Sequence, residues 1–111
     1  MSERSSGDVQ VALVSAPDEA CAAAIARALV EERLAACVQV LPRMRSIYRW
    51  EGTVHDEPEA LLVAKTCAAR ADALEARVRA LHPYEVPEVV RLDVAGGSPA
   101  YLAWVLAETK P

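Results

Sequence analysis

Phenylalanine is missing from this chain of 111 residues, and histidine occurs only twice. Hydrophobic residues still make up 53% of the sequence, with alanine supplying much of that fraction. An alanine-rich core packs closely but removes little apolar area from water per residue, which favours further burial by self-association. Because His55 and His82 are the only histidines, any chemistry that needs an imidazole has to use one of them.

The sequence also lacks an excess of positive charge and a long apolar run. It has 12 Lys and Arg residues against 16 Asp and Glu residues, a net charge of -4, which argues against a nucleic-acid partner. No stretch reaches the roughly 18 consecutive apolar residues of a membrane span. The polar start MSERSSGD predicts a disordered leader over residues 1–8, followed by a single domain over 9–111 in a cytoplasmic protein.

Cysteine is scarce and widely spaced. Cys21, Cys37 and Cys67 are odd in number and lack the short spacings of a zinc motif, so we expect reduced thiols rather than disulfides. The sequence contains no HExxH motif, no phosphate-binding glycine loop and no pattern of a catalytic triad. These absences predict a protein that is not an enzyme.

Strand and helix patterns alternate along the chain. Apolar residues three and four apart predict helices that begin near Ser15 and Pro17, at residue 69, and at Ser98 and Pro99, with the first ending near Leu34. Valine-rich stretches predict strands over 9–15, 37–50, 60–67 and 86–94. This order predicts an α+β fold, a ferredoxin-like split βαβ sandwich with a C-terminal helix, whose two main helices lie on one face of an antiparallel sheet.

The middle of the chain predicts a long hairpin turning at Glu51-Gly52. Pro42 indicates a bulge or an edge position in its first strand, and the charged residues 56–59 predict an interruption of the return strand. Such a hairpin is too long for one small domain to cover. In the last strand, Val90 and Leu92 alternate with charged residues and predict a half-exposed strand.

Several short motifs resemble the CutA family of divalent-cation tolerance proteins. They are APDEA at 16–20, LAACVQV at 34–40, IYRWEG at 47–52, KT at 65–66, HPYEVPE at 82–88 and YLAWV at 101–105. The resemblance implies a PII-like homotrimer in which the long hairpins pair with neighbouring subunits. It also implies weak binding of copper or another divalent cation, without a defined enzymatic reaction.

His82 and Cys37 are the candidate metal ligands. Neutral imidazole is a common ligand of copper and zinc, and copper(I) favours thiolates. The alternatives are a histidine that hydrogen-bonds the last carbonyls of a helix and a small buried hydrophobe. Relatives with a proposed copper site carry a cysteine and a second histidine where this sequence has Val14 and Leu81, so the resemblance implies weak binding only.

Other polar and aromatic residues are candidates for a cleft or an interface between subunits. Lys65 lies in an apolar strand, so it either pairs with a carboxylate or faces a wet cleft. Tyr48 and Trp50 near the hairpin turn are expected to make trimer contacts rather than to stack on bases. The remaining candidates, whose alternative role is ordinary surface charge, are Glu59, Tyr84, Glu85 and Glu88.

These residues leave three functions open. The main hypothesis is a homotrimeric, non-catalytic CutA-type protein that binds copper or other divalent cations. The alternative is a PII-like signalling module that binds a small anionic ligand in the intersubunit cleft, and the third is an enzyme that uses the same cleft. The expected partners are copies of the chain itself and a metal ion, with neither nucleic acid nor membrane.

Overall fold

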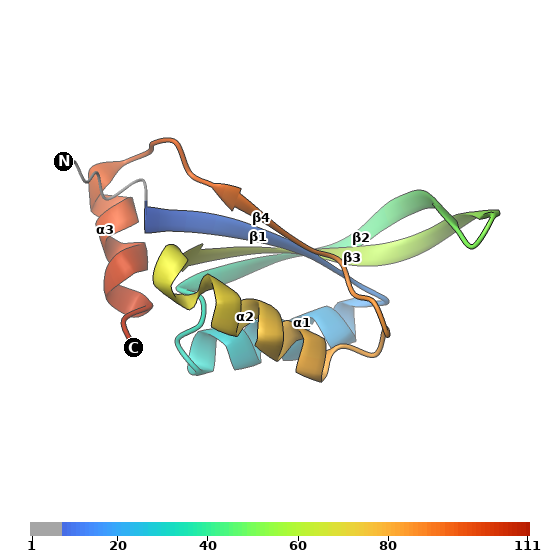
Figure 1. Cartoon of the computed structure of the whole chain (residues 1–111), viewed down its shortest axis with the longest axis horizontal. Coiled ribbons are helices and arrows are strands. Elements are labelled where there is room, and N and C mark those ends of the chain that lie inside the picture. The colour runs from blue at the N-terminus through green and yellow to red at the C-terminus, as the bar shows by residue number, and fades with distance from the viewer. Residues whose placement is uncertain (1–7) are drawn as a thin grey trace.

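The computed structural model describes residues 8–111, which form an α+β fold with a four-stranded sheet (Figure 1). The elements are β1 (Val9–Ala16), α1 (Glu19–Glu31), β2 (Cys37–Trp50), β3 (Thr53–Cys67), α2 (Ala68–Leu81), β4 (Val89–Asp93) and α3 (Pro99–Glu108). The predicted order of elements is therefore confirmed. The predicted leader falls almost wholly outside the described residues.

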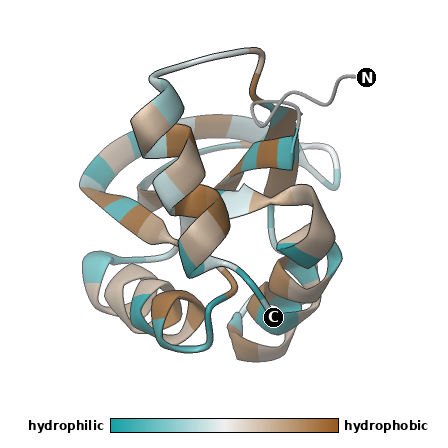
Figure 2. Ribbon diagram, turned by 90° about the vertical axis from the view of Figure 1, so that its left-hand side faces the viewer, coloured by the Kyte–Doolittle hydropathy of each residue, from teal (hydrophilic) through white to brown (hydrophobic). Residues whose placement is uncertain are grey.

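The sheet has the strand order β2-β3-β1-β4, and every neighbouring pair is antiparallel. Helices α1 and α2 lie side by side on one face, and α3 stands across one end of the sheet (Figures 1 and 2). This arrangement is the predicted split βαβ sandwich with an added C-terminal helix.

The main core lies between the sheet and helices α1 and α2. Alternate residues of β1 and β3 point to this side and are mostly alanine, valine or leucine, which lets the helices approach the strands closely. The fully buried members include Ala12, Val14, Ala60, Leu62, Ala64, Leu29, Leu74 and Val78. A smaller cluster joins Leu102 and Val105 of α3 to Val9 and Ala36.

Helix α1 begins later and ends earlier than predicted. Its N-cap is Asp18, whose Oδ1 accepts a hydrogen bond of 2.8 Å from the Cys21 amide, while Ser15 belongs to β1. The helix ends at Glu31, and Arg33 takes a left-handed conformation with φ of 61° that turns the chain towards β2. Ser98 is the N-cap of α3, but its side chain makes no capping hydrogen bond.

The hairpin differs from the prediction in its second strand. β3 runs without a break through residues 56–59, because Asp56, Glu57, Pro58 and Glu59 all pair with β2. The irregularity is on β2 instead, between Leu41 and Met44, where Pro42 predicted a bulge. The turn residues Glu51 and Gly52 have φ of 51° and 81°, the pair of left-handed conformations that a two-residue hairpin turn needs.

Within residues 8–111, the outer part of the hairpin has no neighbouring strand. β1 pairs with β3 only from Ala60 to Cys67, so residues 53–59 of β3 pair with β2 alone. This two-stranded segment projects from the domain (Figure 1) and gives the chain its longest dimension of 48 Å against 25 and 21 Å. Both of its edges therefore carry unpaired backbone groups.

Among the described residues, the sheet face opposite α1 and α2 is covered at one end alone, by α3. Strand register places Cys37, Lys65, Val11 and Leu92 in one row across this face, and Gln39, Val63, Leu13 and Val90 in the next row. Leu92 is 48% exposed and Val90 is 45% exposed. The apolar side of β4 thus faces solvent in the single chain, whereas Arg91 turns towards α2 and pairs with Asp72. We call this face, made of Val11, Leu13, Leu61, Val63, Val90 and Leu92, the uncovered face.

Candidate functional site

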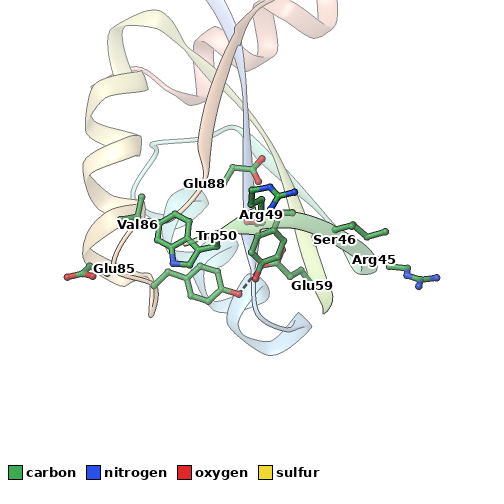
Figure 3. Close-up of a pocket in the computed structure, with 12 residues that line it drawn as sticks. Arg45, Ser46, Arg49, Trp50, Glu59, Glu85, Val86 and Glu88 are labelled. Carbon is green, nitrogen blue, oxygen red and sulfur yellow. Dashed lines mark hydrogen bonds between the residues drawn. The ribbon is translucent and has the colours of Figure 1, made fainter. Parts of the chain in front are cut away.

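A groove of about 800 Å³ lies between the outer hairpin and the loop after α2 (Figure 3). One wall comes from β2 between Arg45 and Trp50, and the other from residues 84–88, with Glu59 of β3 between them. Because the bulge and the turn fix the course of β2, the groove is built from elements that one chain already holds in place.

His82 positions the loop that forms the second wall. Its ring is buried at 8% exposure, and Nδ1 accepts a hydrogen bond of 3.1 Å from the Tyr84 amide. Nε2 therefore carries the proton and donates to the Ser15 carbonyl at 2.7 Å. Both ring nitrogens are thus engaged, and the imidazole ties the loop to the end of β1.

Two tyrosines that line the groove each donate a hydrogen bond to a carboxylate of β3. Tyr84 donates to Glu59 at 2.8 Å, and Tyr48 donates to Glu57 at 2.7 Å. Burial and the bond to Glu59 raise the pKa of Tyr84, and the bond to Glu57 raises the pKa of Tyr48. Both phenols consequently stay protonated at neutral pH and hold the two carboxylates in fixed positions.

Side chains of both charges surround the groove. Arg45 is held by Asp56 through two hydrogen bonds of 2.8 and 2.7 Å, which lowers the pKa of Asp56. Glu85 and Glu88 stand at the loop side, and the indole of Trp50, 50% exposed, extends between the hairpin and the loop (Figure 3).

The structure gathers most of the candidate cleft residues but not the two candidate ligands. Residues Tyr48, Trp50, Glu59, Tyr84, Glu85 and Glu88 all line the groove. Lys65 lies outside it, where its ammonium group donates to the amide oxygen of Gln39. Cys37 is paired with Lys65 across β2 and β3, and its Sγ lies 3.2 Å from the Tyr101 hydroxyl. His82 binds the Ser15 end of β1, so Cys37 and His82 do not share one site within a chain.

Sequence reasoning missed Glu57 and Tyr101. Glu57 lies two residues before Glu59 on β3, so their side chains share a face of the strand. Had the sequence predicted an uninterrupted β3, it would also have predicted that Glu57 and Glu59 lie on the same face. The charged residues 56–59 suggested a break in the strand instead. The contact of Tyr101 with Cys37 joins residues 64 positions apart, and no local pattern signals it.

Comparison with known proteins assigns the fold to a family. Residues 10–108 match the family described as the CutA1 divalent ion tolerance protein. The chain belongs to the CutA1 family. This confirms the resemblance seen in the sequence motifs.

Similar proteins come from bacteria, animals and plants. The divalent-cation tolerance protein CutA of Thermus thermophilus is 50% identical over 100 residues, which cover 90% of this chain and 97% of that protein. Mouse protein CutA is 48% identical, but this chain spans only 56% of its length. A solved structure of CutA1 from Oryza sativa superposes with a TM-score of 0.91 at 37% identity, covering 96% of this chain and 98% of that one.

The names of CutA relatives point to different compartments. The Arabidopsis thaliana relative, 40% identical over 90% of this chain and 55% of its own length, is called chloroplastic. Within residues 8–111 of this CutA chain, no helix is long and apolar enough to cross a membrane.

The two candidate metal ligands lie apart, without a cluster of further ligands among the described residues. Among residues 8–111, no three His, Cys, Asp or Glu side chains come together in a way that could hold an ion. The thiol of Cys37 is partly exposed, whereas His82 would have to give up a hydrogen bond to bind.

Proposed function

We propose that this CutA chain acts in divalent-cation tolerance as a homotrimer that binds copper or another divalent cation weakly and catalyses no reaction. The uncovered face carries this proposal. It is a continuous apolar sheet surface in which Leu92 and Val90 stay about half exposed, so a second copy would remove it from water. The bare edges of the outer hairpin offer further pairing to neighbouring chains.

Association of several chains would also help to form the proposed metal site. Cys37 lies on the uncovered side of the sheet, next to Lys65 and Tyr101. Close approach of several chains would bring further ligands to its thiol, which copper(I) favours. His82 is the second proposed ligand, and it would bind only after releasing the Ser15 carbonyl. We expect affinities in the micromolar range or weaker, equal to about 8 kcal/mol or less.

The alternative of an anionic ligand in a PII-like module is not favoured. The groove carries the carboxylates of Glu59, Glu85 and Glu88, which repel an anion. Arg45, which is one of its two arginines, is already held by Asp56. A cytoplasmic location also belongs to this proposal, and fractionation of the producing cell tests it.

Calorimetry under reducing conditions tests metal binding. We expect copper(I) to bind the wild-type protein and Cys37→Ala to weaken that binding, while Cys67→Ala, which changes a buried thiol outside the site, leaves it unchanged. Light scattering at micromolar concentration should give a mass near three chains. If Cys37→Ala and His82→Ala both leave the affinity for copper(I) unchanged, neither residue is a metal ligand. A mass of one chain would overturn the trimer.

A further inference from the structure

We propose that the groove beside the hairpin binds a small organic cation through its ammonium group. This site is distinct from the proposed metal ligands, because neither Cys37 nor His82 lines it. All the residues that line it belong to one chain. The proposal rests on the charge of the groove, on its aromatic surfaces and on the state of Glu59.

The charge of the groove favours a cation. Three carboxylates, those of Glu59, Glu85 and Glu88, line it together with two arginines. Arg45 is neutralised by its paired hydrogen bonds to Asp56. Arg49 is then the remaining basic group against three carboxylates, and a cation entering the groove gains attraction in a partly enclosed space.

The aromatic surfaces favour an organic cation over a bare metal ion. Trp50, Tyr48 and Tyr84 all line the groove, and Val86 adds apolar surface beside the indole (Figure 3). The face of an aromatic ring attracts ammonium groups, and tryptophan does so best. A small hydrated metal ion gains nothing from such surfaces, whereas the alkyl part of an organic amine packs against them.

Glu59 is prepared to accept the ammonium group. The Tyr84 hydroxyl donates to its Oε2, and the raised pKa of Tyr84 keeps that proton on the phenol. Within residues 8–111, no hydrogen bond engages the other carboxylate oxygen, which keeps its acceptor capacity for a ligand. The carboxylate is therefore oriented before binding, which lowers the entropy lost when the ligand binds.

Tryptophan fluorescence tests the proposal with a simple probe. The chain has two tryptophans, so Trp104→Phe on α3 leaves Trp50 as the reporter in the groove. We expect n-butylammonium to change its emission in a saturable way, and 1-butanol, which has the same shape without the charge, to have no such effect. Equal responses to both compounds, or no response to either, would overturn the proposal.

Two matched substitutions in the Trp104→Phe protein locate the site. Glu59→Gln should weaken binding of n-butylammonium about tenfold or more, the loss expected for one hydrogen bond between charged groups. Glu31→Gln removes a carboxylate of α1 that pairs with Arg27 outside the groove, and binding should be unchanged. Equal affinities in the two variants would contradict the site.

Two controls separate this inference from the proposed function. Circular dichroism checks that Glu59→Gln is folded, and if it is not, Glu88→Gln takes its place with the same expected direction. Copper titration and light scattering of the same samples report on the metal and the trimer independently. A protein that binds copper as a trimer but does not bind n-butylammonium would overturn this inference alone.

Discussion

At the scale of single residues, His82 shows how a candidate ligand serves as a structural connector. Its two ring nitrogens bridge the Ser15 carbonyl and the Tyr84 amide, and thereby place one wall of the groove. The sequence revealed that histidine is rare and that Pro83 follows His82. It could not reveal the bond to Ser15, because that contact joins positions 67 residues apart.

Replacing His82 by alanine should therefore reduce stability. The substitution leaves the Ser15 carbonyl without its partner in a buried position, which costs about 1–3 kcal/mol. Urea unfolding of the purified protein measures this loss. His55→Ala is the matched control, because His55 stacks on Tyr48 at the outer hairpin, and we expect a change below about 0.5 kcal/mol. Similar losses in both variants would refute the connecting role.

At the scale of elements, the starts of helices α1 and α3 look alike in sequence but differ in structure. Each start combines a proline with a residue that can cap, and Ser15, Asp18 and Ser98 all have a suitable side-chain oxygen. Only the course of the backbone decides which oxygen reaches an amide. β1 continues to Ala16 and takes Ser15 into the sheet, which leaves Asp18 as the cap.

Asp18→Ala should consequently destabilise the protein by about 1 kcal/mol. Its carboxylate accepts the Cys21 amide hydrogen bond, and alanine cannot replace that bond. Ser98→Ala provides the comparison, since the Ser98 side chain makes no capping bond and its loss should be close to zero. Chemical denaturation of both variants gives the two values, and the reverse order would contradict the assigned caps.

The place of β3 in the hairpin, rather than its local sequence, also explains why this strand is continuous. Residues 56–59 are charged or proline, a composition that disfavours a strand in the middle of a sheet. The segment nevertheless pairs with β2, because it lies in the outer hairpin where side chains reach water on both faces. Composition alone could not show that this stretch lies beyond the domain.

At the scale of the whole molecule, the sequence predicted the fold class, the order of elements and the excess length of the hairpin. The spacing of apolar residues identified the helices and strands, because apolar residues recur every three or four positions in a helix and every two positions in a strand. It did not identify the uncovered face, since alternation gives two faces of a strand without saying which one receives the helices. On β4 the apolar side faces out and Arg91 faces the helices, where Asp72 and Glu75 neutralise it.

The uncovered face leads to a prediction for assembly. Leu92→Glu places a charge on this face and should convert the proposed trimer to single chains, because an unpaired carboxylate is costly to bury between copies. Ala24→Glu adds the same charge on the exposed side of α1 and should leave the mass near three chains. Light scattering at equal concentrations measures both. A trimeric mass for Leu92→Glu would show that the interface between chains lies on another surface.

The bare edges of the outer hairpin have a further consequence for the order of events in folding. A hairpin closed by a two-residue turn forms in about 1–10 μs, before strands that are distant in sequence have met. β2 and β3 are contiguous in the chain, whereas β4 pairs with β1, from which α1, β2, β3 and α2 separate it. Early in folding the hairpin therefore stands alone with both edges open. In a crowded solution, pairing between hairpins of different chains then competes with completion of the fold within one chain.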